Sequence, residues 1–586
     1  MVARTRGKIA AHAAFMILLF AYVGFHAAHW SPAYAGVDDN GYWRQGSSLA
    51  LHGDSRFKLE SPLQYVHRSY TGDSDAGYFR SKYPPGFPLL IATGMKAFGH
   101  HAALTIPLLL SSALLVGCYK LTQATCSNPI APLVATLLLA ASPVFNVRTD
   151  QGDAHLFSAA LFVWGSSLLY APASSQSRWR AVLAGLFLGS IPAVRYLDSL
   201  LIPAVIVGIL SWREAGLVRF ERLAWAAVGA SVSLLFFAAW SWETWGAPWA
   251  TGYAGSGEHS GFFGAWTLRH FTQYISYLPS FGFGAAFILG IVGALTMCRH
   301  RKQIHLGTCL FASTGTLLIV CSGYYWGPPT DPQITLRFLF PLLPLYCVAA
   351  ACLLDQLFHD ISQRAFLWAA LLVCTVQGIA SAPSVMASTS VAGLAKQIMS
   401  TAHEGAKKAI PAGSLVVADD QLLQFFDYEQ TWKLVSARAI APGLRDTFTG
   451  MPLPFPFQPG RDDKRVAVFR AATGDTRMWL LAKELKRWGG SQFYYLAPVG
   501  SEPLDYRLTT HCQNVLTIPL PKAPDFPAPE SVFGANMIPR RKSPRNALPW
   551  HEEFESRLPI GVHIQADLSR LDPARPLLVQ RCTLRL

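Results

Sequence analysis

Two adjacent carboxylates open the segment of this chain whose residue types are best suited to chemistry. They lie in Asp38-Asp39-Asn40-Gly41-Tyr42, and Lys82-Tyr83-Pro84-Pro85-Gly86 follows later in the same loop. A carboxylate that is partly buried beside a like charge can hold a raised pKa and accept a proton from a hydroxyl group. Asp38 or Asp39 is therefore a candidate base, and Tyr42 is a candidate for the same pocket. Two solvated acids in a surface loop are the alternative explanation.

The Lys-Tyr-Pro-Pro-Gly turn predicts a stiff start to a new apolar segment. Proline at the beginning of a helix loses no needed hydrogen bond, and the residue before proline stays extended. Such a turn would hold Arg80 and Lys82 toward the lipid headgroups, where phosphate is their natural partner, with Tyr83 between them and the prolines. A rigid turn with cations that reach toward the membrane surface would account for the same residues.

Three further candidates stand where apolar segments begin. Arg148 and Asp153 flank one such start, where Asp153 could cap a helix for about 1 kcal/mol and also line a substrate pocket. Arg337 opens the run Arg337-Phe338-Leu339-Phe340-Pro341. A cation near hydrocarbon costs up to a few kcal/mol unless it meets a partner, so Arg337 indicates either a lipid-phosphate ligand or an interfacial anchor. Arg195 could pair locally with Asp198.

The glycine-rich loop from residue 252 to 264 carries Glu258 and His259. These two side chains could close over a bound substrate or help to hold a divalent metal ion. No ligand spacing enforces metal binding, so the metal requirement stays open.

The elements that must position these residues are mostly membrane helices. The chain has 586 residues, of which 51% are hydrophobic and only 14% are charged, a composition too apolar for a soluble protein of this size. Apolar runs of sufficient length predict about eleven spans. They cover residues 9–30, 101–122, 129–146, 152–171, 179–195, 196–212, 223–246, 274–298, 305–326, 338–358 and 365–383.

Lysine and arginine near the span ends predict the orientation, because cationic loops stay in the cytoplasm. The clusters at residues 4–8, 178–180, 213–222 and 299–302 fall on one side of this arrangement. The loop 31–85 and the tail therefore face outward, most simply from a bacterial inner (plasma) membrane. A signal peptide cleaved after Ala35 is an alternative for the first span, but its apolar length favours an uncleaved helix.

Residues 384–586 predict a soluble α/β domain that follows a membrane domain of residues 1–383. The runs 415–418, 465–469, 493–496 and 577–579 are typical of short strands, and residues 478–488 space their apolar side chains helically before Gly489-Gly490. Cys512 and Cys582 stand alone in this outward tail, where an oxidising exterior permits a disulfide. Mixed acids and bases in the tail give no indication of nucleic-acid binding.

Taken together, these motifs resemble the GT-C class of integral-membrane glycosyltransferases, which includes protein O-mannosyltransferases and aminoarabinose transferases. The match rests on Asp38-Asp39 with Tyr42, a Leu-x-x-x-Gly step at 49–53, the Lys-Tyr-Pro-Pro-Gly turn, Arg148 with Asp153, and the run at 337–344. The aminoarabinose enzymes have Asp-Glu and Lys-Pro where this chain has Asp-Asp and Lys-Tyr-Pro. The resemblance implies a polyprenyl-phosphate sugar as donor, inversion at the anomeric carbon, and a glycan, lipid or protein as acceptor.

Two other functions fit part of the sequence. A transporter or flippase of a lipid-linked sugar would share the apolar content, but it usually needs ionisable groups near the bilayer midplane, whereas here they gather at span ends. A scaffold that binds cell-wall polymer through its tail would not need the aspartate pair.

Overall fold

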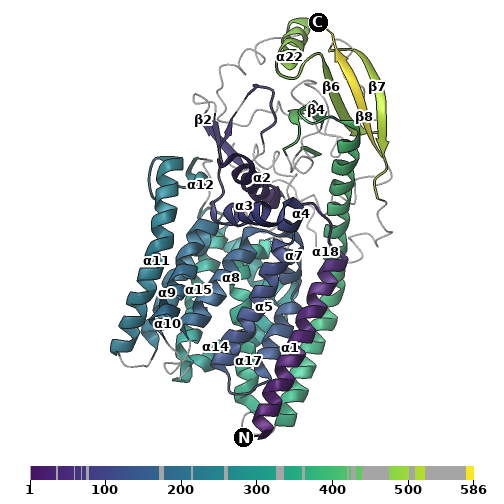
Figure 1. Cartoon of the computed structure of the whole chain (residues 1–586). Coiled ribbons are helices and arrows are strands. Elements are labelled where there is room, and N and C mark those ends of the chain that lie inside the picture. Colours follow the sequence, from purple (N-terminus) through teal and green to yellow (C-terminus); the bar gives the residue numbers. More distant parts are fainter. Residues whose placement is uncertain are drawn as a thin grey trace. The chain divides into compact units, whose positions relative to one another are not determined.

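The computed structural model describes most of the chain in two compact units (Figure 1). The described residues are 2–34, 37–58, 60–66, 69–73, 78–170, 177–212, 216–255, 262–301, 303–324, 335–358, 363–418, 422–423, 430–437, 474–499, 508–521 and 576–585, with the backbone alone for 2–8, 37–40, 71–73, 216–217, 255, 391, 474, 477 and 498. The first unit comprises residues 1–30, 83–90 and 105–390, and the second comprises residues 31–82, 91–104 and 391–586.

The first unit consists of helices, many of which lie side by side along their length (Figure 1). They are α1 (Val2–Ala28), α5 (Ile106–Thr125), α6 (Ala131–Ala140), α7 (Pro143–Gln151), α8 (Ala154–Leu169), α9 (Arg178–Val194), η2 (Leu197–Leu200), α10 (Leu201–Ser211), α11 (Gly216–Trp245), α12 (Gly252–Gly255), α13 (Thr267–Tyr277), η4 (Leu278–Gly282), α14 (Ala285–Arg299), α15 (Ile304–Gly323), η5 (Arg337–Leu342), α17 (Leu343–Phe358) and the first part of α18 (Gln363–Ala409). Within the described residues, six helices are long and apolar enough to cross a membrane, or up to eight if each bent pair counts as one span. The protein is thus a multi-pass membrane protein.

Each predicted span falls mainly on helical residues, but two of them are broken by a bend of more than 40°. The segment 129–146 is divided into α6 and α7, which meet at 64°. The segment 274–298 lies across a bend of 114°, with α13 and η4 on one side and α14 on the other. Proline at the start of α7 and in η4, together with Gly284 at φ 59°, accounts for these breaks. The last predicted span continues past residue 383 in α18, through Pro383 to Ala409.

Small residues hold the helices close together. A Cβ atom added at Gly185 of α9 would overlap the carbonyl group of Ala226 in α11, and one added at Gly229 would overlap that of Val182. Gly293 of α14 meets Ala349 of α17 in the same way. Between apolar helices in lipid, such close approach provides packing that the hydrophobic effect cannot supply.

The second unit begins with α2 (Val37–His52) and a small antiparallel sheet, β1 (Phe57–Lys58), β3 (Tyr78–Ser81) and β2 (Tyr70–Asp73) in that order. Phe57, Tyr70 and Phe79 pack together beneath this sheet. The chain then enters α3 (Gly86–Phe98) and α4 (His100–Ala103). Since α3 begins directly after Pro85, the helix start predicted from the two prolines is confirmed.

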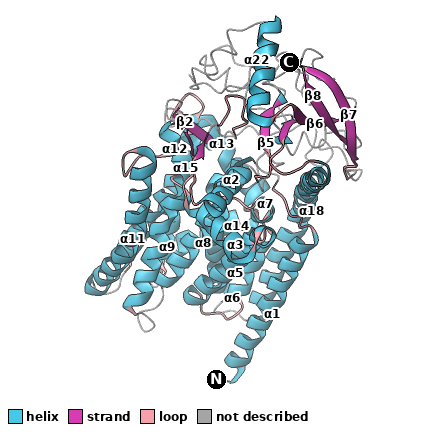
Figure 2. Cartoon of the chain, turned by 45° about the horizontal axis from the view of Figure 1, so that its top comes forward, coloured by secondary structure: helices cyan, strands magenta, loops and turns pink. Residues whose placement is uncertain are grey.

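A five-stranded sheet forms the core of the rest of this unit, in the order β5 (Lys433–Ser436), β4 (Leu415–Ala418), β6 (Gln492–Pro498), β8 (Leu577–Leu584) and β7 (Thr509–Ile518). Strands β5, β4 and β6 are parallel, and β8 pairs antiparallel with β6 and β7 (Figure 2). Alternate side chains face α22 (Gly474–Gly489) on one side and the end of α18 on the other. Cys512 of β7 and Cys582 of β8 form a disulfide, a bond that the sequence permitted but left open.

Part of the predicted outward loop belongs to this sheet. Leu63 is buried in the core beneath α22, and Gln64 forms an antiparallel bridge with Val435 of β5. The Tyr65 amide donates to the carbonyl of Leu434 at 2.7 Å, and the Trp488 indole donates to the Glu60 carboxylate at 2.9 Å. The loop is therefore held to the sheet by backbone pairing as well as by a buried side chain.

Most strands and the helix predicted in the tail are present. Strands β4, β6 and β8 and helix α22 lie where the sequence placed them, and Gly490 at φ 88° follows α22. The predicted strand at 465–469 lies outside the described residues.

Candidate active site: a cationic cluster

Arg148 is the most deeply buried charged side chain of the predicted site. It lies near the end of α7, which stops at Gly152 in the left-handed conformation, φ 71°. Asp153 then caps α8 by accepting a hydrogen bond from the His155 amide at 3.0 Å. The capping role predicted for Asp153 is thereby confirmed. Its second carboxylate oxygen pairs with the guanidinium of Arg148, which also contacts Gln151.

Arg195 joins two further side chains to this group. It follows the last residue of α9, where the backbone is extended, and its Nε donates to the Asp198 carboxylate at 2.9 Å. The local pairing predicted for these two residues is confirmed. One of its terminal nitrogens faces Nε2 of His155, which therefore accepts this hydrogen bond and leaves the imidazole neutral.

Arg337 approaches the same histidine from η5. Its guanidinium lies 5.1 Å from the centre of the Phe338 ring, and the Arg195 guanidinium lies 5.9 Å from that ring. The His155 ring meets Phe338 edge to face at 5.8 Å. The guanidinium groups of Arg148, Arg195 and Arg337 all lie near the imidazole of His155. Phe338 thus serves as a platform between two of the three cations.

We call Arg148, Asp153, His155, Arg195, Asp198 and Arg337 the cationic cluster. Within this group of six side chains, three guanidinium groups accompany two carboxylates and a neutral imidazole, so the group itself contains more cations than anions. The Nε of Arg148 is buried and has no hydrogen-bond partner among the described residues, nor does the hydroxyl of Tyr274, which lies near Arg337. A buried cation with an unused donor is costly unless an anion satisfies it, so the arrangement is suited to binding phosphate.

The proline turn lies beside this cluster. A Cβ atom at Gly86 would come within 2.7 Å of the Ala193 carbonyl oxygen, so only glycine lets the turn pack against the end of α9. Phe87 packs against Phe157 of α8 at 6.3 Å. The turn that follows Lys82 therefore packs against Ala193, which precedes Arg195 by two positions in the sequence.

The sequence-predicted residues divide between the two units. Arg148, Asp153 and Arg337 come together in the first unit, which also contains the buried Tyr83. The second unit contains Asp38, Asp39 and Tyr42 on α2, Arg80 on β3, and Lys82 directly after β3. Tyr42 is buried, whereas Arg80 and Lys82 are half-buried. The side chains of Asp38 and Asp39, and all of Glu258 and His259, lie outside the described residues.

Metal binding finds no support in the part of the chain that is described. There, no three histidine, cysteine, aspartate or glutamate side chains are grouped so that they could hold a metal ion.

His155 is the member of the cluster that the sequence did not reveal. In the sequence, His155 follows the capping Asp153 by two residues and is indistinguishable from an ordinary residue in the first turn of a helix. The available signal was an ionisable side chain inside an apolar segment, which is a functional hypothesis by default. Arg195 was recognised only as a partner of Asp198.

Comparison with solved structures identifies the fold. The chain superimposes on ArnT from Cupriavidus metallidurans in the apo state with a TM-score of 0.53 and 13% identity, covering 83% of this chain and 93% of ArnT. ArnT bound to undecaprenyl phosphate gives a TM-score of 0.52 with the same identity and coverage. This chain has the GT-C fold.

The GT-C fold was the fold expected from the loop motifs. At 13% identity the likeness to ArnT establishes the fold alone. An oligosaccharyltransferase from Archaeoglobus fulgidus, tethered with an acceptor peptide, also matches, but its TM-score of 0.46 is too low to support an argument. No protein-family model and no curated protein sequence matches the chain.

Proposed function

We propose that this protein is an inverting glycosyltransferase that moves a sugar from a polyprenyl phosphate to an acceptor at the outer face of a bacterial inner membrane. The observation that carries the proposal is the cationic cluster, which groups the buried guanidinium of Arg148 with two half-buried arginines in a chain with the fold of ArnT. The solved ArnT structure contains undecaprenyl phosphate, which is a lipid phosphate of the kind proposed here.

The reaction is a single displacement. Asp38, with Asp39 as the alternate, accepts the proton of the acceptor hydroxyl, whose oxygen bonds to the anomeric carbon. The bond from that carbon to the phosphate oxygen breaks, and its electron pair leaves on the lipid phosphate. Attack opposite the leaving group inverts the anomeric centre. A hexose and a pentose are equally compatible with this chemistry.

Cations matter more here than a second acid, because a lipid phosphate already leaves readily. Arg337, Lys82 and Arg80 stabilise the charge that develops on the departing phosphate. Arg148 and Asp153 belong to the substrate pocket, together with Tyr42, Tyr83, Glu258 and His259. The residues 384–586 form an extracytoplasmic α/β domain in this proposal.

The positions of the ionisable residues in the cationic cluster do not favour a transporter. Arg148, Asp153, Arg195 and Arg337 each stand within three residues of a helix end. A translocation path would instead place ionisable groups along the middle of the spans.

The proposal is tested by measuring sugar transfer after the donor has been identified. A strain that lacks this protein should accumulate a polyprenyl-phosphate sugar, and mass spectrometry identifies that lipid. The identified lipid then serves as donor in a transfer assay with the purified protein. Replacing Asp38→Asn and Asp39→Asn together should lower kcat about 10²- to 10⁴-fold, since a general base is removed. Asp54→Asn is the matched control, an acid of the same loop that pairs with Arg56 at the surface, and it should transfer normally. Wild-type transfer by the double variant would refute the proposal.

A further inference from the structure

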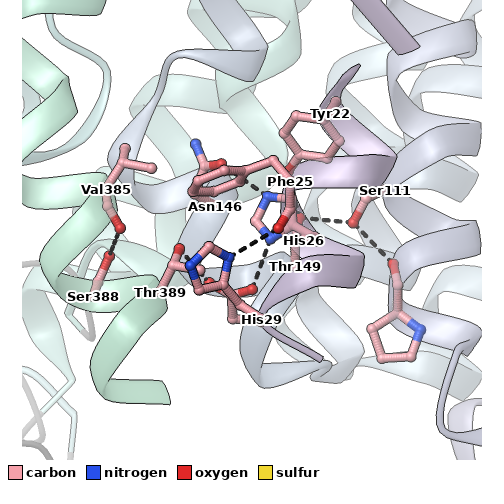
Figure 3. Close-up of polar contacts among 12 residues, drawn as sticks. Tyr22, Phe25, His26, His29, Ser111, Asn146, Thr149, Val385, Ser388 and Thr389 are labelled. Atoms are coloured by element: carbon pink, nitrogen blue, oxygen red, sulfur yellow. Dashed lines mark hydrogen bonds and ion pairs between the residues drawn. The ribbon is translucent and has the colours of Figure 1, made fainter. Parts of the chain in front are cut away.

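A second buried polar network lies in the first unit, outside the cationic cluster (Figure 3). Its centre is His26 near the end of α1. The Nδ1 atom of His26 lies 2.7 Å from Oδ1 of Asp150, and Nε2 lies 2.9 Å from Oδ1 of Asn146. All three side chains are buried, with Asp150 the most exposed at 8%.

The orientation of Asn146 fixes the protons of the histidine. Its amide nitrogen donates to the carbonyl oxygens of Ala140 and Ser142, each at 2.8 Å. Oδ1 of Asn146 must therefore face His26, and because it can only accept, Nε2 carries a proton. A second proton lies between Nδ1 and the carboxylate of Asp150. The His26–Asp150 pair has no net charge whichever of the two groups holds this proton. Burying the pair therefore costs less free energy than burying a single charge.

The network joins three helices that are distant in sequence. The other oxygen of Asp150 accepts a hydrogen bond from the Thr389 hydroxyl of α18 at 2.6 Å. A parallel chain of hydroxyl groups runs from Tyr22 of α1 through Thr149 of α7 to Ser111 of α5, with both distances 2.7 Å. Figure 3 shows these side chains converging from separate ribbons.

Helix α7 depends on such contacts for its orientation. It has only 9 residues, and it lies between the bend after α6 and the left-handed Gly152. A helix this short is not stable by itself, so its neighbours must fix its position. Asn146 and Asp150 are four residues apart and share one face of α7, while Arg148 and Gln151 contact each other at the cationic cluster.

We propose that the His26–Asp150 pair, with Asn146 and Thr389, is a positioning network that orients α7 so that Arg148 is held in the cationic cluster. It thereby sets the affinity of the protein for lipid phosphate. The identity of that ligand rests on the proposed function, whereas the positioning is argued from the hydrogen bonds alone. None of these four residues needs to touch the ligand.

The test measures the binding of undecaprenyl phosphate to the full chain in lipid nanodiscs. His26→Gln and Asp150→Asn should each weaken binding about tenfold, because α7 loses a fixed orientation. In an Arg148→Gln background the same two changes should alter binding about twofold or less, since their effect passes through Arg148. The double variant H26Q/D150N should recover part of the affinity. Its two amide side chains can hydrogen-bond to each other, whereas each single variant leaves an amide opposite an ionisable group.

The matched control is Ser112→Ala, which removes a hydrogen bond to the Leu108 carbonyl that stays within α5. It should bind like the wild type. Thermal unfolding of every variant shows whether it is folded. If a single variant does not fold, the H26Q/D150N variant provides the comparison with the wild type.

Two results would overturn the inference, and they are distinguishable. If His26→Gln weakens binding by the same factor with and without Arg148, the pair is a general structural contact and does not position Arg148, while the proposed function stands. If Arg148→Gln alone leaves binding unchanged, the phosphate role of the cationic cluster fails, and the positioning role fails with it.

Discussion

At the scale of single residues, Asp153 performs two tasks that can be separated. One carboxylate oxygen caps α8 and the other balances the buried charge of Arg148. Asparagine caps a helix as well as aspartate but carries no charge, whereas alanine does neither.

We therefore expect Asp153→Asn to lower stability through the unbalanced Arg148, at a cost of about 3–5 kcal/mol for a broken buried pair. Asp153→Ala should lower it by about 1 kcal/mol more, since the cap is also lost. Thermal unfolding in detergent compares the two variants. Equal midpoints for Asn and Ala would mean that the cap contributes nothing.

Contacts between near neighbours in sequence were predictable, and those between distant residues were not. The Asp153 cap spans two residues and the Arg195–Asp198 pair spans three, so local sequence contains both partners. His26 and Asp150 are separated by 124 residues. No periodicity links such a pair, although a histidine inside the first apolar segment was a visible signal.

At the scale of elements, hydrophobicity located the helices but not their bends. The two bent pairs depend on proline and glycine within otherwise apolar runs, and a sliding count of apolar residues passes over them. Contacts between helices could not be predicted either, because the sequence does not distinguish a glycine that packs against another helix from a glycine that faces lipid.

Gly185→Ala tests this packing. Alanine favours a helix by about 1 kcal/mol over glycine, but here its Cβ would overlap the Ala226 carbonyl, at a cost of about 1–3 kcal/mol or more. We expect the midpoint of thermal unfolding to fall. Gly315→Ala in α15 is the control, since nothing lies within 4 Å of an added Cβ there, and its midpoint should stay or rise. A fall of equal size in both variants would contradict the account.

At the scale of the whole molecule, each compact unit is assembled from separate stretches of the chain. The second unit combines the loop from residue 31 to 82 with residues 391–586, and Leu63 is buried in the core of its sheet. Sequence analysis placed both parts on the same side of the membrane, but it treated them as separate domains. A single leucine followed by a glutamine gives no sign that Gln64 pairs with Val435 in a distant strand.

The tail is also bonded to the segment that carries the proposed base. Helix α2, which carries Asp38 and Asp39, is tied to the tail by Arg44, whose guanidinium donates to the Leu423 carbonyl at 2.8 Å. Helix α18, from Gln363 to Ala409, contains residues of both units. A scaffold whose tail acts alone would have no need of these contacts.

The central claim, that the cationic cluster receives a lipid phosphate, is tested most directly by comparing undecaprenyl phosphate with undecaprenol, which differs only in the phosphate. The wild-type protein should bind the phosphate form at least about tenfold more tightly, because a charged hydrogen bond contributes roughly 1.5–3 kcal/mol. That preference should disappear when Arg195→Gln and Arg337→Gln are combined, and it should survive Arg178→Gln, which alters an exposed ion pair. Equal binding of the two lipids by the wild type, or an unchanged preference in the double variant, would contradict the account.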